Sequence, residues 1–479
     1  MLRSAALAGP PGAWIAFFLG ALLELGVARL LFGFTVDDAL IPARYAHHLA
    51  TGAGYVMNRG GPSTDGVTPL GFAHLLAPFA QANALHAHVA AKWIGALATA
   101  VGAGAVSAAA WKARGDALRL LGLVALFGSL PLAAWGASGM ETGLVTGLVG
   151  VAASLRISDR RHFVAAALLG IAAALRPELL PMVLVLATPR GPSSTEGLAL
   201  GRDHAARAGL ATAPFIVVAA MRGVLFGRAA PLSSVAKAPD VSLGAKYALA
   251  CFLLAGPLAL ALPIGWGRLS AYARWLVLAV LVHLAAVAFA GGDWMPLSRL
   301  VVPAVPIVAL ALVELGRASP RWSSAVRALI LVATYGFVWI GQSAKAMRVE
   351  ADRAALIEEA SRVLAGRKVV ASLDIGWVGI AAPDATIVDL AGVTDPTVAV
   401  LPGGHTSKHL PPGFLDDRGV DAMALLLLGS EGVADPWSAT RFSRNAEYTA
   451  VWGLRDEAAF HPALVHDRTP RYVVVVKAP

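Results

Sequence analysis

Hydrophobic runs separated by short polar loops fill residues 14–344. Many of these runs are about 20 residues long, which is the length a helix needs to cross a membrane. Basic residues gather in alternate loops, for example at 112–119 and 190–207. Because basic loops favour the cytoplasmic side, this alternation predicts about eleven transmembrane helices with a cytoplasmic N-terminus and an external C-terminus.

The pattern changes after residue 344. A charged amphipathic helix is predicted over 347–366, and short β-type runs follow at 368–373, 386–390, 422–428 and 472–477, separated by loops rich in Gly, Pro and Asp. The predicted fold class is therefore an all-α polytopic membrane domain over residues 1–344, followed by a small extracytoplasmic α/β domain over 345–479.

Composition supports a membrane protein. The chain is 57% hydrophobic and 14% charged, against about 45–50% and about 25% in ordinary soluble domains. A net charge of +9 would suggest nucleic acid in a soluble protein, but here the basic residues lie in loops that set orientation, so no nucleic-acid partner is expected. Cys251 is the single cysteine, which excludes an intramolecular disulfide and a cysteine-based metal site.

The external loop over residues 34–87 opens with two adjacent carboxylates, Asp37 and Asp38, ahead of a helix predicted over 39–51. Acids at the mouth of a membrane helix are costly unless water or a partner solvates them, which makes this pair a candidate catalytic site. Alternatively, Asp38 caps the following helix and Asp37 is simply solvated. The sequence leaves both interpretations open.

Other charged residues gather at the outer edge of the predicted membrane domain. Taken singly, each could be a snorkelling side chain or half of an interhelical pair. Taken together, cations that hold phosphate and carboxylates that accept protons suit chemistry on a lipid-linked anion. The predicted phosphate-binding residues are Arg176, Lys237, Arg299, Arg222 and Arg228, and the predicted substrate-binding residues are Arg44, Tyr45, Glu141, Glu178 and Asp293.

These segments, in this order, resemble the GT-C superfamily of integral membrane glycosyltransferases, and most closely the bacterial terminal arabinofuranosyltransferases. The matching segments are 37–39 with 44–46, 68–70, 138–142, 176–178, 236–237, 291–295 with Arg299, and 374–376 with 388–395. The resemblance implies a GT-C-like fold, a polyprenyl-phosphate sugar as donor, and a catalytic Asp in the first external loop, which here is Asp37 or Asp38.

The implied reaction moves a sugar, with arabinofuranose as the candidate, from that donor to a cell-envelope glycan on the external side of a bacterial inner membrane. A carboxylate would activate the acceptor hydroxyl, and the donor phosphate would leave. Asp37 is the favoured base, because bonds from a capped helix would lower the pKa of Asp38. The scheme needs no certain cofactor, and a divalent cation at the two acids is left open.

Two alternatives remain from the sequence. A lipid-linked glycan transporter or flippase would need the spans and cations but no chemistry, and a weaker alternative is sugar transfer to protein or lipid A. The external domain is expected to contribute to acceptor binding and not to the chemical step, because residues 372–395 contain no obvious acid–base pair.

Overall fold

The computed structural model describes residues 11–478 except 112–115, 157–160, 188–196, 238, 262–266, 268, 407, 428–453, 456–458, 467 and 469. The chain forms two compact units, each built from segments far apart in the sequence. The helical unit contains Met1–Phe34, Ala91–Val218 and Pro239–Met347. The mixed unit contains Thr35–Ala90, Ala219–Ala238 and Arg348–Pro479. The domain boundary predicted at residue 345 stays a prediction.

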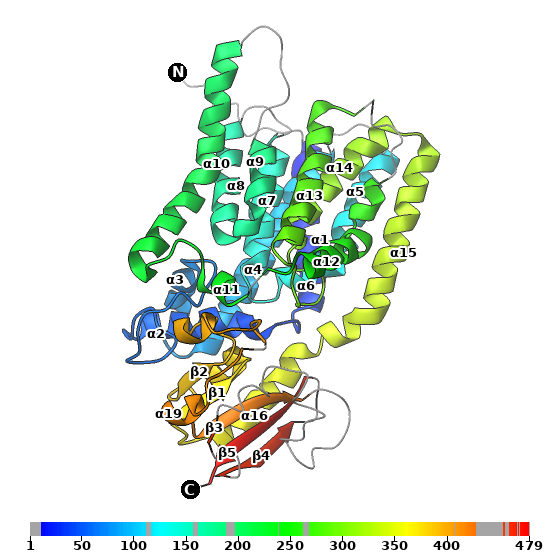
Figure 1. Ribbon diagram of the computed structural model, residues 1–479. Helices are drawn as coiled ribbons and strands as arrows, with labels where there is room; N and C mark the ends of the chain where they lie inside the picture. The colour runs from blue at the N-terminus through cyan, green and yellow to red at the C-terminus, as the bar shows by residue number, and fades with distance from the viewer. Residues whose placement is uncertain are drawn as a thin grey trace. The chain divides into compact units, whose positions relative to one another are not determined.

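Apolar helices that pack side by side make up the helical unit (Figure 1). They are α1 (Pro11–Leu30), α5 (Asp116–Phe127), α6 (Leu130–Gly136), α7 (Thr142–Arg156), α8 (His162–Leu175), α9 (Leu180–Ala187), α12 (Val241–Leu254), α13 (Ala271–Phe289), α14 (Val305–Ala318) and α15 (Arg321–Ala346), with most of α4 (Ala84–Trp111) and α10 (Gly197–Phe226). Short 3-10 turns join them, namely η3 (Pro177–Leu179), η4 (Pro257–Leu260) and η6 (Val302–Ala304).

Glycine allows α4 and α7 to approach closely. A methyl group added at Gly147 would lie 2.2 Å from the carbonyl oxygen of Ala98, and one at Gly102 would lie 2.8 Å from the Cα of Gly147. Small residues of this kind let membrane helices pack backbone to backbone.

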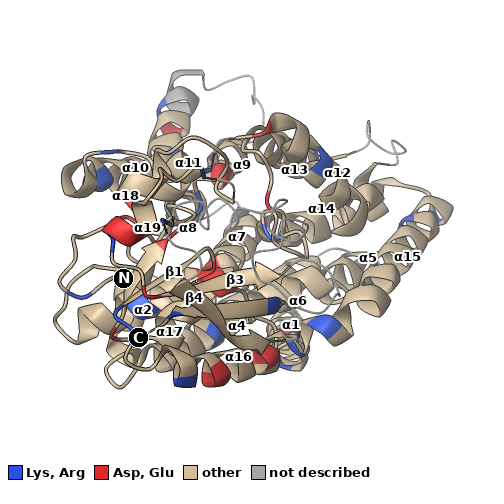
Figure 2. Cartoon of the chain, turned by 60° about the horizontal axis from the view of Figure 1, so that its bottom comes forward, with Lys and Arg blue, Asp and Glu red and all other residues tan. Residues whose placement is uncertain are grey.

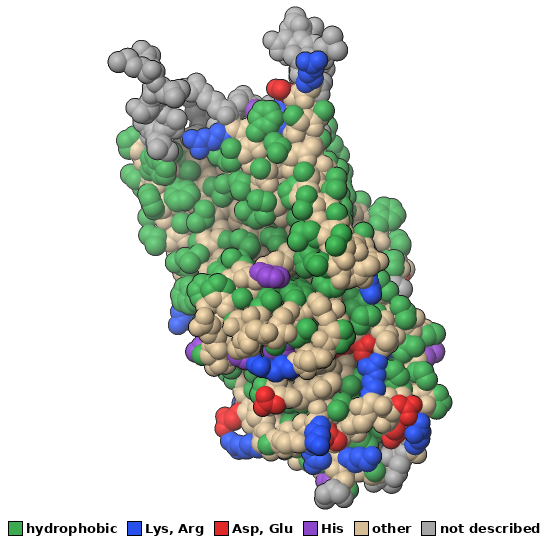
Figure 3. Space-filling view, turned by 90° about the vertical axis from the view of Figure 1, so that its left-hand side faces the viewer, with side chains coloured by type: hydrophobic (Ala, Val, Ile, Leu, Met, Phe, Trp, Pro, Cys, Tyr) green, Lys and Arg blue, Asp and Glu red, His purple; other side chains and the backbone are tan. Residues whose placement is uncertain are grey.

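Five helices within the described ranges are long and apolar enough to cross a membrane. Four shorter apolar helices accompany them there. Large apolar side chains face outward, including Leu19, Phe337 and Ile340 at 62%, 70% and 89% exposure, and on the face in Figure 3 hydrophobic side chains cover much of the helical unit. These features suit a membrane protein. The count of about eleven spans stays a prediction, and α5 and α6 are separate helices with Ser129 as the N-cap of α6.

The mixed unit combines residues 35–90 and 219–238 with the C-terminal part of the chain. Its helical elements are η1 (Asp37–Ala39), α2 (Leu40–Ala50), α3 (Phe72–Leu76), η2 (Ala77–Phe79), α11 (Leu232–Ala236), α16 (Val349–Leu364), α17 (Ile375–Ala381), α18 (Pro396–Ala399) and α19 (Phe414–Asp417). Its strands are β1 (Val369–Ser372), β2 (Thr386–Asp389), β3 (Ala422–Leu427), β4 (Phe460–His466) and β5 (Arg471–Lys477).

The strands form a five-stranded sheet in the order β2-β1-β3-β5-β4. Strand β1 pairs in parallel with β2 and β3, while β5 pairs antiparallel with β3 and β4. The predicted α/β character of this region is confirmed. Strand β4 was not predicted, because Pro462 interrupts its β pattern; the strand tolerates this proline because it lies at the sheet edge, with an irregular register between Pro462 and Leu464.

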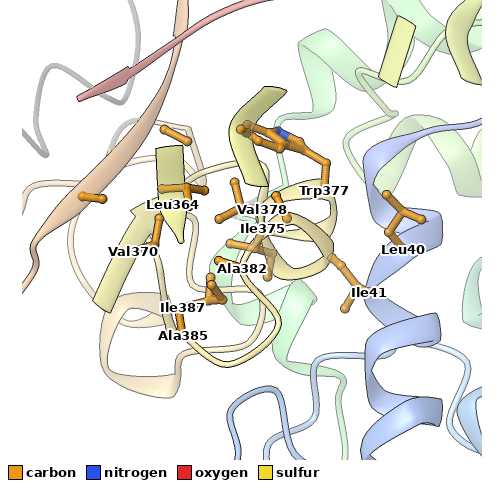
Figure 4. Packing of buried hydrophobic residues seen from close by; sticks show 14 of the residues in the cluster. Leu40, Ile41, Leu364, Val370, Ile375, Trp377, Val378, Ala382, Ala385 and Ile387 are labelled. Carbon is orange, nitrogen blue, oxygen red and sulfur yellow. The ribbon is translucent and has the colours of Figure 1, made fainter. Parts of the chain in front are cut away.

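Side chains alternate between the two faces of the sheet, as strand geometry requires. Val370 and Ile387 lie in one apolar cluster, whereas their neighbours Ala371 and Val388 lie in the other. The first cluster also contains residues of α2, α16 and α17. Figure 4 shows Leu40 and Ile41 pointing from the loop helix toward the residues of α17. Residues 35–90 therefore pack on the C-terminal α/β part through a shared core.

Candidate functional site

The acidic pair lies in η1, directly before α2. Asp37 is buried at 4% exposure, whereas Asp38 is half-buried. The residue at the N-cap position is Val36, and among the described residues no side chain caps η1 or α2. The interpretation that Asp38 caps the helix is therefore wrong, because Asp38 lies inside the first turn and not ahead of it.

Asp37 instead caps a helix from a distant part of the chain. Its Oδ2 accepts a hydrogen bond from the N–H of Gly376 at 2.8 Å, and its Oδ1 accepts one from the N–H of Trp377 at 2.8 Å. Arg353 Nη1 donates to Oδ1 at 3.1 Å. The carboxylate thus meets the amide end of α17, where the helix dipole favours negative charge.

Arg44 binds the opposite end of the same helix. Its Nη1 donates to the carbonyl oxygens of Gly379 and, at 3.5 Å, Ala382, while Nη2 donates to Ala385 at 3.1 Å. Its Nε donates to the carbonyl oxygen of Met57 at 2.8 Å. A cation at the carbonyl end complements the helix dipole. Because the backbone occupies its donors, these contacts favour a structural role for Arg44 over the predicted contact with substrate.

Tyr45 is also part of the core. Its ring is fully buried and lies 4.8 Å from the ring of Tyr55, measured between centroids. Its hydroxyl group shares a hydrogen bond with Thr64 Oγ1 at 2.7 Å. These contacts likewise favour a structural role for Tyr45.

A third carboxylate acts on the acidic pair. Burial, followed by the negative charge of Asp374, raises the pKa of Asp37 to about 7, while Arg353 opposes the rise. Burial also raises the pKa of Asp374, whose Oδ2 accepts a hydrogen bond from the hydroxyl group of Tyr472. Asp38 adds a further negative charge that acts on both. Arg353 is thus the cation that offsets a concentrated negative charge.

A second polar cluster in the mixed unit is built around Arg222. Its Nε donates to Asp65 Oδ2 at 2.9 Å and its Nη2 donates to the carbonyl oxygen of Thr68. Burial raises the pKa of Asp65, and the positive charges of Arg222 and, more weakly, Arg228 oppose this. Within the part of the chain that the structure describes, neither Arg228 nor Lys237 forms an ion pair, and both are half-buried.

Removing Arg222 should destabilise the fold. The side chains of Arg222 and Asp65 are 2% and 1% exposed, so Arg222→Met leaves a buried carboxylate without its cation, at a cost of about 3–5 kcal/mol. Thermal unfolding of the purified protein would measure this loss. Arg222→Met combined with Asp65→Asn should recover part of it. A control is Arg362→Met, because the Arg362–Glu358 pair is exposed and should contribute little. An unchanged unfolding temperature for Arg222→Met would contradict the structural role.

In the helical unit, Arg176 follows α8 and meets two carboxylates. Its Nη1 donates to Glu141 Oε1 at 2.8 Å, and its Nε lies 2.7 Å from Glu178 Oε1. The charge of Asp293 acts on it as well. Since the nearby acids outnumber this guanidinium, a phosphate at Arg176 would compete with them for its positive charge. Its predicted phosphate-binding role stays a prediction.

Arg299 lies after a strained turn in the same unit. Leu297 and Ser298 have positive φ angles of 56° and 54°, a backbone region that costs energy for such residues and recurs at functional sites. The indole N–H of Trp135 donates to the carbonyl oxygen of Leu297 at 3.0 Å. Arg299 Nε lies 2.6 Å from Asp293 Oδ2. The turn and the tryptophan therefore fix the Arg299–Asp293 pair.

The predicted site residues thus fall into separate groups. The mixed unit contains Asp37, Asp38, Arg44, Tyr45, Arg222, Arg228 and Lys237, and the helical unit contains Glu141, Arg176, Glu178, Asp293 and Arg299. Across the described ranges, no group of three or more His, Cys, Asp or Glu side chains is arranged to hold a metal ion.

Arg353, Tyr472 and Asp65 were absent from the predicted site. Arg353 resembles the other charged residues of α16, several of which are visible in Figure 2. Tyr472 begins an apolar strand, and Asp65 lies in a Gly-rich irregular segment. The amphipathic pattern of α16 shows which side of the helix is buried, but it does not show that this side packs against η1. Arg353 therefore could not be predicted as a site residue from that pattern alone.

No protein-family model and no curated protein sequence matches the chain. Several solved structures are similar to it in fold. ArnT from Cupriavidus metallidurans in the apo state is 15% identical with a TM-score of 0.55, and the match covers 98% of both chains. The structure of ArnT from this organism bound to undecaprenyl phosphate is 14% identical with a TM-score of 0.55, over 98% of this chain and 99% of that chain.

A third structure is the archaeal oligosaccharyltransferase AglB from Archaeoglobus fulgidus, in complex with an inhibitory peptide and a dolichol-phosphate. It is 11% identical with a TM-score of 0.52, over 96% of this chain and 74% of that chain. At these identities the likeness concerns the fold. The chain therefore shares the fold of these ArnT and AglB structures, which confirms the predicted helical fold class in outline. The likeness to arabinofuranosyltransferases stays a prediction.

Proposed function

We propose that the chain is a membrane glycosyltransferase that moves a sugar from a polyprenyl-phosphate donor to a glycan acceptor of the cell envelope. Support comes from the acidic pair Asp37–Asp38 in the external loop of a GT-C-like fold. ArnT was solved with undecaprenyl phosphate and AglB with a dolichol-phosphate, which are both phosphorylated polyprenols. Arabinofuranose is the candidate sugar. The mixed unit would face the external side of a bacterial inner membrane.

Asp38 is the proposed base. Both oxygens of Asp37 are occupied by hydrogen bonds, whereas Asp38 is half-exposed and its carboxylate bonds to no group within the described residues. The acceptor hydroxyl would transfer its proton to Asp38 while its oxygen attacks the anomeric carbon. The bond from that carbon to the phosphate oxygen would break, and the phosphate would leave with the electron pair. This reverses the preference for Asp37 drawn from the sequence, because the supposed cap at Asp38 does not exist.

Arg228 and Lys237 are the proposed ligands of the donor phosphate. Arg176, Arg299 and Arg222 each already pair with a carboxylate, so a phosphate would have to compete with it. Arg228 and Lys237 flank α11 and are half-buried, which would strengthen a charge-assisted contact relative to one in open water.

Arg228→Ala and Lys237→Ala should weaken donor binding. A hydrogen bond to a charged group contributes about 1.5–3 kcal/mol, so each change should raise the donor Kd roughly tenfold to a hundredfold. Binding of polyprenyl phosphate to the purified variants would measure this. Lys246→Ala is the matched control, because Lys246 is an exposed lysine on α12. If both variants bound polyprenyl phosphate as tightly as the wild type, the paired arginines Arg176, Arg222 and Arg299 would be the better candidates for phosphate binding.

The function itself is tested by reconstituting the purified protein in liposomes. Mass spectrometry of co-purified lipid would identify prenyl length and sugar, and that donor would then be offered with envelope glycan fragments. Transfer of the sugar, with release of polyprenyl phosphate, is the expected result. Movement of the intact lipid-linked sugar across the bilayer without transfer would favour the transporter instead.

A further inference from the structure

We propose that Arg353 is a positioning residue, which holds the Asp37 carboxylate together with the first amides of α17 and thereby fixes the neighbouring Asp38 for transfer. This inference rests on the proposed glycosyltransferase function. We call Asp37, Arg353 and the amides of Gly376 and Trp377 the Asp37 lock.

The lock joins three separate elements at one carboxylate. Asp37 lies in η1, Arg353 in α16, and Gly376 and Trp377 in the first turn of α17. Arg353 and Asp37 are 316 residues apart in sequence, yet their side chains are 10% and 4% exposed. Charge-assisted hydrogen bonds that are shielded from water are stronger and more directional than exposed ones. The acid is therefore held in one orientation from two sides.

A second attachment prevents α17 from turning about the lock. Arg44 binds the carbonyl oxygens at the other end of the helix, so residues seven apart in the loop hold both ends of α17. Glycine permits this close contact. A methyl group at Gly376 would lie 2.1 Å from the carbonyl oxygen of Asp37, and one at Gly379 would lie 2.9 Å from Arg44 Cδ.

Asp38 follows the fixed residue directly, and its carboxylate is half-exposed. Because the lock holds the Asp37 carboxylate through three hydrogen bonds, it restricts the residue that carries it and thereby limits where the side chain of Asp38 can lie. A catalytic group must be held near its productive geometry, and a displacement of about 1 Å can slow a reaction roughly a hundredfold. The residues that hold Asp37 therefore act on the transfer step through Asp38.

Charge explains why an arginine is needed. Asp37, Asp38 and Asp374 act on one another, and the Tyr472 hydroxyl donates to Asp374. Burial and the charge of Asp374 raise the pKa of Asp37, and Arg353 opposes this. Without Arg353, Asp37 would more readily take up a proton and become a weaker acceptor for the two amides. Arg353 thus helps to keep the lock closed, because its positive charge favours the ionised form of the Asp37 carboxylate.

Through Arg353 the C-terminal part acts on the chemical step, in addition to the acceptor binding expected from its sequence. Arg353 donates to Asp37 and, within the described residues, forms no hydrogen bond with Asp38. Its loss should therefore lower kcat and leave the KM values for donor and acceptor nearly unchanged, whereas a residue that binds substrate would mainly raise KM.

Kinetics of three variants of the full-length protein test this. Arg353→Met should lower kcat roughly tenfold to a hundredfold, with both KM values within about twofold. Arg353→Lys, which keeps the charge, should recover part of the lost rate. The matched control is Arg362→Met, which removes an exposed arginine from the same helix and should keep the wild-type kcat. A wild-type kcat for Arg353→Met, or a raised KM with unchanged kcat, would overturn the inference.

Hydrogen exchange separates failure of the lock from failure of the proposed function. The Gly376 and Trp377 amides should exchange faster in Arg353→Met than in Arg362→Met, and Arg353→Met with Asp374→Asn should slow them again by removing one negative charge. Unchanged protection in Arg353→Met would overturn the lock whatever the reaction is. If wild-type protein transfers no sugar while the exchange pattern appears as expected, the proposed function fails and the lock remains. Global loss of protection in Arg353→Met would show that Arg353 maintains the fold as a whole, which also overturns the inference.

Discussion

Asp38→Asn should slow glycosyl transfer by roughly a hundredfold or more, while folding and donor binding stay close to wild type. Asparagine keeps the size and shape of the side chain but accepts no proton at neutral pH. Asp38 is half-exposed and, within the described residues, caps no helix, so the change should cost little stability. The measurement is single-turnover transfer with saturating donor and acceptor, which reports the chemical step.

Asp37→Asn is the informative comparison. Asparagine has a nitrogen in place of one of the two bonded carboxylate oxygens, so its N–H donors would face the donor of Gly376, or those of Trp377 and Arg353. This variant should also lose rate, but faster amide exchange in α17 should accompany the loss. Asp38→Asn should lose rate with that protection intact.

The opposite pattern would reassign the base. If Asp38→Asn transfers sugar at the wild-type rate and Asp37→Asn is inactive with α17 still protected, then Asp37 accepts the proton. Full activity in both variants would contradict a carboxylate mechanism at this loop and would favour the transporter.

Periodic segments of the fold could be predicted from the sequence. The helix expected over 39–51 is η1 and α2, and the amphipathic helix expected over 347–366 is α16. Predicted strands at 368–373 and 386–390 match β1 and β2 closely. In each case local hydrophobic spacing decides the structure, so one segment suffices to predict it.

Partners across the chain could not be predicted in this way. Adjacent acids before a helix indicate a local cap, and nothing in residues 34–51 shows that Asp37 would cap α17 instead. Similarly, Arg44 was placed among the substrate-binding residues with the matching segment 44–46, whereas its hydrogen bonds to backbone carbonyls of the C-terminal part favour a structural role. In both cases the tertiary partner of a charged side chain cannot be predicted from spacing along the chain.

Gly376→Ala should be strongly disruptive for so small a substitution. The added methyl group would lie 2.1 Å from the carbonyl oxygen of Asp37 and 2.9 Å from its Oδ2. Backbone atoms cannot rotate away, so η1 and α17 must separate. Overpacking of this kind costs about 1–3 kcal/mol and sometimes more. Because the shift breaks the hydrogen bond to the Gly376 amide, kcat should fall together with the unfolding temperature.

Substitutions at two other glycines of the mixed unit should have smaller effects and allow a comparison. At Gly379 the nearest atom is Cδ of the Arg44 side chain, 2.9 Å away, which can move, so Gly379→Ala should be milder. At Gly223 nothing lies within 4 Å, so Gly223→Ala should change little or stabilise α10 slightly, because alanine favours helix over glycine by about 1 kcal/mol. Thermal unfolding and kcat for the three variants would measure the order. If Gly376→Ala behaved like Gly223→Ala, then η1 would not lie against α17, and the contacts that place Asp37 at its amide end would be wrong.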